Sequence, residues 1–454
     1  MAARSHLAYA GGEGIGGFLT TNLYIPDDHL ERQLRCFLSD SPGSPVDRRP
    51  RTGLPAAGAE LFHPCPPTGA RMTHENPLYL DHNATTPVDP RVLEAMLPWL
   101  RGGFGNPSSP HAHGVRARDA VETARSQAAA LLGAPVGGII FTSGGTESDN
   151  HAVVGAAKLG RRASRDELVI SAIEHPAVSG PCLELAEAGC RTLVLGVDSE
   201  GRVDTDAAAR AIGPRTALVS VMHANNETGA IQPVAAIARL ARQAGALMHT
   251  DAAQSAGKIP VRMDELGVDL LTVAGHKLYA PKGVGLLCVR EGLALPNLMF
   301  GAGHEQGRRP GTENVAGIVG LGRACEIAQR ELADEAQRLA TLRDQLAALL
   351  CAAVPGAAVH AAGAERLPNT LSIGFAGVVA GRVLAHLPDV AVSAGAACHG
   401  AGGGSSVLEA MGVAPELALG TLRVSLGHGT RAGDIPHAAA AITLAVAAAR
   451  ADAH

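Results

Sequence analysis

The sequence is poor in aromatic side chains and has no long apolar run. Phe, Trp and Tyr together make up 3% of the 454 residues, while glycine occurs 55 times. This bias alone points to no particular function. No uninterrupted apolar stretch approaches the roughly 18 residues that a helix needs to cross a bilayer. The sequence therefore predicts no transmembrane segment and no membrane partner.

The chain also lacks an excess of positive charge and a disulfide pattern. Its formal net charge is -5 and its Lys and Arg residues are scattered, so nucleic acid is a poor candidate partner. The eight cysteines include no Cys-x-x-Cys pair and are too sparse for a small disulfide scaffold. This pattern favours reduced thiols and a cytoplasmic location, and it predicts no metal site.

A length of 454 residues suits one large domain and one smaller domain. Residues 1–71 differ from the rest because Pro-rich and Gly-rich patches interrupt any periodicity, so we expect a disordered or non-native extension there. A transit peptide is an alternative, but four acidic residues among the first 31 disfavour it. From Met72 the sequence "MTHENPLYLDHNATTP" is typical of a natural protein start.

Seven short apolar runs alternate with Ala-rich stretches from about residue 89 onward. They lie at 138–142, 168–171, 192–196, 217–222, 246–250, 270–274 and 284–289. Such runs, joined by helices, predict an α/β fold with a mainly parallel seven-stranded sheet. We assign this large domain to residues 89–335.

The remaining part of the chain has a different pattern. From about residue 336, helical spacing of apolar residues is followed by the short runs "AAVH", "NTLSIGF" and "LRVSLG". This pattern predicts a smaller α+β domain at residues 336–454, and we also assign residues 72–88 to it.

Polar residues follow several of the predicted strands, where open α/β sheets bind their ligands. In "FTSGGTESDN", two glycines permit close approach of the backbone, and Thr146 and Ser148 are expected to cap a helix whose N–H groups face an anion such as phosphate. A capped turn without a ligand is the plainer interpretation. His175 follows the next strand, and a lone histidine is more often structural than catalytic.

Further polar groups recur at successive strand ends. "MHANNETG" places Asn225, Asn226 and Glu227 after one strand, and "HTDAAQSAGK" places Asp251 and Gln254 after the next. An acid in such a position commonly only caps a helix. The repetition along one edge of the sheet argues instead for a single shared pocket.

Lys277 lies in the loop "TVAGHKLYAPKGVG", three residues past a predicted strand. A solvated lysine is the ordinary interpretation. A lysine desolvated beside His276 would instead have a lowered pKa and form a Schiff base with a carbonyl cofactor. Pyridoxal phosphate accounts for the whole set, because it needs a lysine for its aldehyde, a carboxylate for its pyridine nitrogen and a phosphate cradle.

With these residues in view, the chain resembles the cysteine desulfurase and selenocysteine lyase family, class V aminotransferase-like enzymes of pyridoxal-phosphate fold type I. The resemblance runs from about Tyr79 to the last predicted helix. It rests on the ordered segments "YLDHNATTP", "GNPSSPHAHG", "SGGTESDN", "EHPAV", "ANNETGAIQP", "HTDAAQ", "GHKLYAPKGVG", "RRPGTENV", "LPNTLSI", "GAACH" and "LRVSLG".

The resemblance implies roles for the residues at the strand ends. Lys277 would bind the aldehyde of the cofactor, and Asp251 would hold the pyridinium proton. Gln254 would approach the ring hydroxyl, while His175 would stack on the ring and help to move protons. Asn226 would lie near the ring and the substrate.

The same resemblance implies a phosphate site shared between two subunits. Thr146, the backbone about Gly145, and His276 would bind the phosphate. Thr312 matches the threonine that this family lends to the partner subunit, which implies a homodimer. One departure is Ala274, which occupies a position that is often serine in the family, so one phosphate hydrogen bond is expected to be absent.

Substrate binding and sulfur transfer complete the implied site. Arg423 matches the arginine that clamps the substrate carboxylate, and Asn106 falls in a segment that approaches the substrate. Cys398, in "SAGAACHGAGGGSS", aligns with the cysteine that takes the sulfur as a persulfide. The glycines around it suit a mobile tether for that transfer, whereas a structural cysteine usually packs in a core.

Three functions compete on this basis. The main hypothesis is a cysteine desulfurase that turns L-cysteine into L-alanine and a persulfide for an iron-sulfur scaffold or another sulfur acceptor. The alternative is a selenocysteine lyase acting on L-selenocysteine, and His399 after the cysteine is similar to some lyase-like members. A non-catalytic partner of iron-sulfur assembly is disfavoured because Lys277, Asp251, His175 and Cys398 are all retained.

Overall fold

The computed structural model describes residues 77–395 and 405–452. The predictions for residues 1–71 and for Cys398 fall outside these residues. Among the described helices, none is long and apolar enough to cross a membrane.

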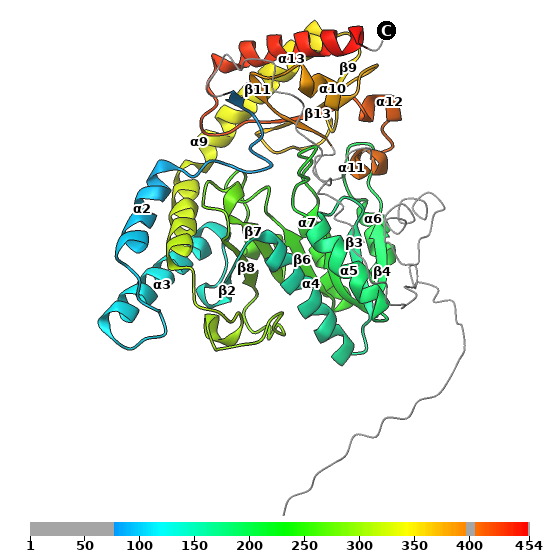
Figure 1. Cartoon of the computed structure of the whole chain (residues 1–454). Coiled ribbons are helices and arrows are strands. Elements are labelled where there is room, and N and C mark those ends of the chain that lie inside the picture. Colours follow the sequence, from blue (N-terminus) through cyan, green and yellow to red (C-terminus); the bar gives the residue numbers. More distant parts are fainter. Residues whose placement is uncertain (1–76, 396–404, 453–454) are drawn as a thin grey trace, which may run out of the picture.

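A seven-stranded sheet forms the centre of the larger part of the molecule, in the order β2-β8-β7-β6-β5-β3-β4 (Figure 1). β3 to β7 pair in parallel, while β8 runs antiparallel to both β2 and β7. All seven predicted runs are strands of this sheet, so the predicted mainly parallel architecture is confirmed. The strands are β2 (Ile139–Thr142), β3 (Glu167–Ser171), β4 (Arg191–Leu195), β5 (Thr216–Ser220), β6 (Leu247–Asp251), β7 (Leu270–Ala274) and β8 (Gly285–Val289).

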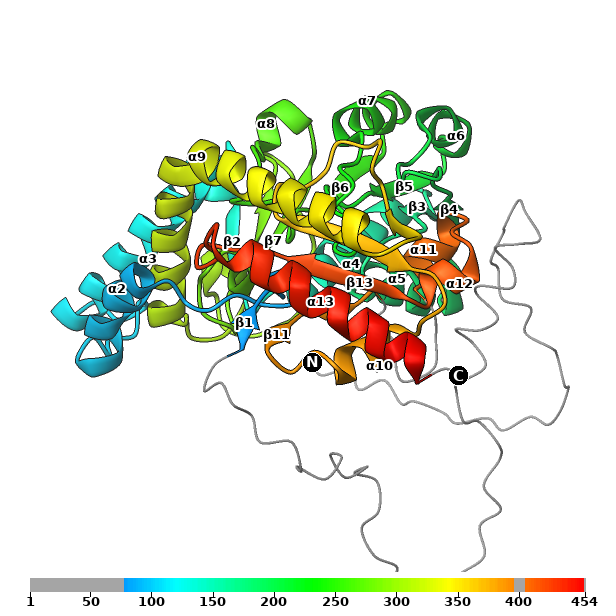
Figure 2. The ribbon, with the colours of Figure 1, turned by 90° about the horizontal axis from the view of Figure 1, so that it is seen from above.

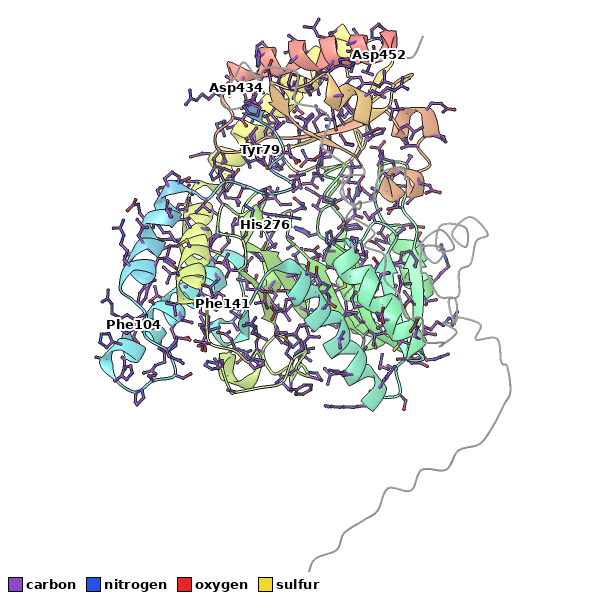
Figure 3. All side chains as sticks on the ribbon, in the orientation of Figure 1. Tyr79, Phe104, Phe141, His276, Asp434 and Asp452 are labelled. Carbon is purple, nitrogen blue, oxygen red and sulfur yellow. The ribbon has the colours of Figure 1, made fainter. Side chains whose placement is uncertain are left out.

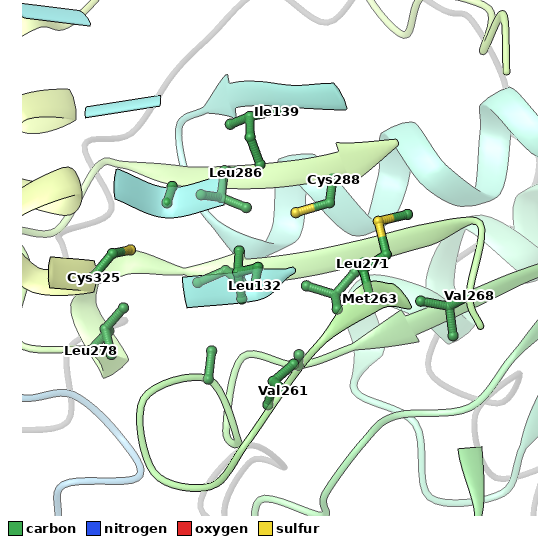
Figure 4. Close-up of a cluster of buried hydrophobic side chains, with 14 of the residues drawn as sticks. Leu132, Ile139, Val261, Met263, Val268, Leu271, Leu278, Leu286, Cys288 and Cys325 are labelled. Atoms are coloured by element: carbon green, nitrogen blue, oxygen red, sulfur yellow. The ribbon is translucent and has the colours of Figure 1, made fainter. Parts of the chain in front are cut away.

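Helices cover both faces of this sheet because its strands are apolar on both sides. Ile139 and Phe141 of β2 pack into the cluster of α3 (Ala112–Leu132), α7 (Val234–Ala244) and the first half of α9 (Val315–Ala353), part of which Figure 4 shows. Ile140, between them, packs with α4 (Gly145–Arg162) and α5 (Pro176–Glu187). Each such buried apolar side chain contributes roughly 1.5–3 kcal/mol, and the two layers hold the strand ends in place.

A second sheet lies beyond the first, in the order β12-β13-β10-β9. Its strands are β9 (Ala357–Val359), β10 (Thr370–Phe375), β12 (Ser393–Ala394) and β13 (Thr421–Ser425). The second half of α9 and α13 (Asp434–Ala451) lie side by side across it, as the view from above shows (Figure 2). A two-stranded sheet of β1 (Leu78–Tyr79) and β11 (Val390–Ala391) adjoins it, and the neighbouring Leu80 is fully buried in this core.

Helix α9 connects the two sheets. Asn314 caps its first turn by accepting from the Gly317 N–H at 3.1 Å. Leu339, Leu342 and Leu346, buried at intervals of three and four residues, give its second half one apolar stripe. The helix runs without a break through residues 335 and 336, where the sequence predicts a limit between two domains. The domain limits therefore stay predictions.

The other helices are short or lie at the edges of the molecule. They are α2 (Pro90–Arg101), α6 (Thr205–Ala211), α8 (Met263–Leu266), α10 (Ala380–Ala385), α11 (Ser406–Ala410) and α12 (Pro415–Ala418), with 3-10 turns η1 (Val136–Gly138), η2 (Gly275–Lys277) and η3 (Glu305–Gly307).

Candidate active site

Three predicted site residues stand at the carboxyl ends of parallel strands. Asp251 is the last residue of β6, and Lys277 ends the η2 turn directly after β7. His175, shortly after β3, caps α5 by accepting from the Ala177 N–H through Nδ1 at 3.1 Å. Burial lowers the pKa of His175, the charge of Lys277 lowers it further and that of Asp251 opposes this. The three side chains therefore lie within electrostatic reach of one another.

Asp251 is buried, with 7% of its surface exposed. Its Oδ1 accepts from the Ala253 N–H at 2.8 Å. Among the residues that the structure describes, no hydrogen bond engages its second oxygen. That oxygen is available to a donor that does not belong to the chain.

Asp149 on α4 is a neighbour of Asp251 that sequence reasoning missed. Burial first, and the charge of Asp251 second, raise the pKa of Asp149 well above its usual range. His249 lies 3.5 Å away, with its Nε2 facing Asp149 Oδ1, and burial lowers the pKa of this histidine to about 3. Because the His249 ring is neutral near pH 7, the pair is not a salt bridge.

The amino-terminal end of α4 forms an open anion cradle. The helix begins at Gly145 after Gly144, and no side chain caps it. The prediction that Thr146 and Ser148 cap this helix is wrong, because the helix starts before both of them. Ser148 Oγ instead bonds Thr142 Oγ1 at 2.8 Å. The first N–H groups of the helix consequently remain available to an anion.

The end of β7 lies directly beside this cradle. A Cβ added to Gly145 would stand 3.2 Å from the Ala274 Cβ, so glycine allows the helix to approach the strand closely. His276, between the two sheets in Figure 3, pairs its Nδ1 with Thr85 Oγ1 at 3.1 Å. Burial and then the charge of Lys277 lower the pKa of His276 to about 4, so its ring is neutral near pH 7.

Asn83, which sequence reasoning also missed, joins several of the predicted residues. Its carbonyl accepts from Gln254 Nε2 at 3.1 Å, and its Nδ2 donates to the Asn226 carbonyl at 3.2 Å and to Thr370 Oγ1 at 2.8 Å. With 1% of its surface exposed, Asn83 links both sheets at one point. In the sequence, only the segment "YLDHNATTP" pointed to this part of the chain, and it did not indicate that Asn83 connects the two sheets.

Arg423 projects from β13 into the same region. Its Nη1 donates to the Asn226 carbonyl at 3.3 Å and its Nη2 to Asp81 Oδ1 at 3.0 Å. Its Nε is buried and has no hydrogen-bond partner in the described part of the chain. An unpaired buried donor on a guanidinium is a suitable contact for a carboxylate. The structure thus brings Arg423 and Asn226 together.

The attachment points on both sides of the Cys398 segment lie beside these residues. Ser393, on β12, pairs with Arg423 in register and donates to Asp81 Oδ2 at 2.8 Å. Ser405 caps α11 and donates to Glu227 Oε2 at 2.5 Å. Burial raises the pKa of Glu227 to about 7, although the hydrogen bond from Ser405 and the charge of Arg423 oppose this. Glu227 thereby anchors the chain where it resumes.

Asn106 and Thr312 lie elsewhere, on two exposed loops. Ser108 Oγ lies 3.3 Å from His304 Nδ1, and His304 contacts Glu313 at 2.9 Å, so the two loops are adjacent. In the described ranges, no hydrogen bond links Asn106 or Thr312 to Asp251 or Arg423. The structure of one chain therefore does not bring these two residues into the buried site.

The loop of Thr312 is nevertheless tied to the anion cradle. Arg309 donates from Nε and Nη2 to the two oxygens of Glu147 at 2.8 and 3.1 Å. Glu147 belongs to the first turn of α4, next to Thr146. This bidentate pair fixes the loop against the start of the helix.

Residues 78–437 match the family described as Aminotransferase class-V. A cysteine desulfurase of Gluconacetobacter diazotrophicus is 46% identical over 365 residues, which cover 79% of this chain and 91% of that relative. The cysteine desulfurase IscS of an Anaeromyxobacter species is 45% identical, covering 80% and 90% of the two chains. The chain therefore belongs to the class-V aminotransferase family and, within it, to the cysteine desulfurase family.

Solved structures agree with this assignment. A NifS-like protein superposes with a TM-score of 0.77 at 36% identity, covering 82% of this chain and all of the other. A structure described as SspA in complex with cysteine has a TM-score of 0.69 at 32% identity, covering 77% and 98% of the two chains. These similarities confirm the predicted family and the predicted fold.

Proposed function

We propose that the protein is a pyridoxal-phosphate-dependent cysteine desulfurase. It converts L-cysteine to L-alanine and accepts the sulfur on Cys398 as a persulfide. The observation that carries this proposal is that Asp251 at the end of β6, Lys277 in the turn after β7 and Arg423 on β13 belong to one region of the molecule. A similar structure contains cysteine by its own description.

The residues present fit pyridoxal phosphate. The uncapped N–H groups of α4 with Thr146 suit its phosphate, and the free oxygen of Asp251 suits its pyridine N–H. Lys277, directly after β7, would bind its aldehyde. When bound, the cofactor supplies an electron sink for the carbon atoms of the amino acid.

The side chains of the protein bind the substrate and direct its protons. The guanidinium of Arg423 binds the substrate carboxylate, and Asn226 orients that guanidinium through its carbonyl. Burial keeps the pKa of His175 low, and because its Nδ1 accepts from the Ala177 N–H, the neutral ring carries its proton on Nε2, from which it is able to donate that proton. The thiolate of Cys398 bonds to the substrate sulfur as the carbon-sulfur bond breaks, and protonation of the carbon completes alanine.

We also propose a homodimer in which Thr312 reaches the phosphate site of the second copy. Thr312 is exposed in the single chain, and Arg309 holds its loop beside the cradle. Phe104 and Phe300, with 80% and 84% of their surface exposed, are apolar groups that a second copy would cover. The proposed protein partner in sulfur delivery is an iron-sulfur scaffold or another sulfur acceptor.

Parallel turnover of L-cysteine and L-selenocysteine tests this proposal. The purified protein, loaded with cofactor, is incubated with each amino acid and a thiol reductant, and alanine, sulfide and selenide are measured. A desulfurase produces alanine and sulfide in equal amounts from cysteine. Turnover of selenocysteine alone would replace the proposal by selenocysteine lyase, and no alanine from either substrate would refute both.

A further inference from the structure

Lys258 is a buried lysine with no place in the mechanism above. It follows Gln254 by four residues, beyond the end of β6, and 7% of its surface is exposed. Its Nζ donates to the Gln254 carbonyl at 2.9 Å and to Gln254 Oε1 at 3.4 Å. The chain has only four lysines among 38 basic residues, and two of them, Lys258 and Lys277, lie in this region.

The surroundings of Lys258 do not explain it as a stabilising ion pair. In the described residues, no carboxylate forms a salt bridge with it. Burial first, and then the charges of Lys277 and Arg423, lower its pKa to about 7. His82 and His276 also face it, and the charge of Lys258 helps to lower the pKa of each. A buried amine among cations is costly, so its retention calls for another explanation.

The hydrogen bonds of Gln254 supply an explanation for the buried Lys258. Its Oε1 accepts from Lys258, and its Nε2 donates to the Asn83 carbonyl at 3.1 Å. These two partners together determine which end of the amide faces which way, because one supplies a donor and the other an acceptor. An amide nitrogen has a second N–H, and within residues 77–395 and 405–452 only the bond to Asn83 engages the Gln254 nitrogen.

We propose that Lys258 is a positioning residue, which locks the Gln254 amide so that it presents an N–H, and not its oxygen, to the ring oxygen of the cofactor. The inference rests on the proposed function. Without Lys258, the amide is free to rotate, and its carbonyl would face an oxygen instead of donating to it.

A lysine suits this position better than an arginine. A primary amine is able to donate both hydrogen bonds in its neutral form, and it then adds no charge beside Lys277 and Arg423. A guanidinium stays charged at every working pH. This difference makes the Lys258→Arg variant informative.

The test follows the pH midpoint of the visible absorption change of the cofactor-loaded protein. A donor to the ring oxygen withdraws electron density and lowers the basicity of the nitrogen that Lys277 contributes. We expect Lys258→Met to raise the midpoint by about one pH unit. Gln254→Ala should raise it by a similar amount, and the double variant no further than either single change. Lys158→Met is the matched control, because Lys158 also donates to a backbone carbonyl, at 3.1 Å, and it should leave the midpoint unchanged.

The outcomes separate the possible roles. Lower thermal stability of Lys258→Met with an unchanged midpoint would overturn the proposal and leave a merely structural lysine. Additive shifts in the double variant would also overturn it, because Lys258 would then act independently of Gln254. If Lys258→Met does not fold, Lys258→Arg decides: its midpoint should not rise above that of the wild type, and a rise of about one unit contradicts the proposal. A wild-type protein without a visible band would instead refute the proposed function itself.

Discussion

Arg423 and Asp81 form an ion pair with 3.0 Å between Nη2 and Oδ1, and only 4% and 18% of their side-chain surfaces are exposed. The pair connects β13 with the segment after β1, and Ser393 holds the second oxygen of Asp81. Asp81 therefore orients the guanidinium of Arg423. The pair explains how an arginine stays buried beside a binding site without losing its orientation.

The first prediction concerns this clamp. Arg423→Lys retains a positive charge but loses the planar fork, so the substrate carboxylate should bind less tightly and KM for cysteine should rise by roughly tenfold or more. Asp81→Asn should also raise KM, because it releases the guanidinium. Steady-state kinetics with stability measured by thermal unfolding checks both. Unchanged KM in Arg423→Lys would remove this residue from substrate binding.

The second prediction concerns Lys277. The loaded wild-type protein should be yellow, and borohydride should fix its cofactor covalently to the chain. Lys277→Ala should lose both properties, because no other described lysine lies in the turn directly after β7, the strand beside β6 and its Asp251. Absorption spectra and mass spectrometry of the reduced protein are the measurements. A borohydride-fixed cofactor in the alanine variant would contradict the assignment.

The sequence predicted the framework of the large sheet well. Runs such as 270–274 are continuous and apolar because both faces of β7 are buried. Such a run of apolar residues is recognisable from the amino-acid sequence alone. His175, Asp251 and Lys277 were found for a related reason. They stand where such runs stop, and the position of a strand end is readable without knowing its neighbours.

The supporting residues could not be found in this way. Asn83 acts through contacts with Thr370 and Asn226, which lie 287 and 143 residues away, and no local pattern marks such a partner. Asp149 lies on a helix, where an acid is usually solvated, and only the folded structure shows the burial that raises the pKa of its carboxyl well above the usual range. The wrong cap at Thr146 has a similar origin: glycine leaves no side-chain signal for a helix start.

The third prediction concerns Glu227 and the pH dependence of stability. Its pKa in the folded protein is about 7 instead of the usual 4.5, so the folded state holds a proton that the unfolded state releases. Stability from this group is present below about pH 4.5 and is lost as pH rises through about 7. Glu227→Gln keeps the shape but does not titrate. Relative to the wild type, the variant should gain up to about 3 kcal/mol between about pH 5 and pH 8.

Urea unfolding at both pH values measures this difference. The buried histidines act in the opposite direction, because a lowered pKa such as that of His223, about 4, costs stability as pH falls below about 6.5. They are present in both proteins, and the comparison removes their effect. A constant difference between variant and wild type across the pH range would show that Glu227 is ionised in the folded state.

The last prediction concerns Cys398, whose assignment rests on the sequence because it lies outside the described residues. Cleavage of cysteine needs this thiolate as the sulfur acceptor, so Cys398→Ala should reduce cysteine turnover by orders of magnitude while the cofactor spectrum persists. Selenium leaves carbon more readily, so selenocysteine should still be cleaved by the variant.

Mass spectrometry after exposure of the wild type to cysteine should find the persulfide on Cys398. The buried Cys182 and Cys288 serve as internal controls, because burial raises the pKa of both thiols and disfavours the thiolate. Full cysteine activity in the alanine variant, or a persulfide only on another cysteine, would remove Cys398 from the reaction and leave the attachments at Ser393 and Ser405 without a catalytic purpose.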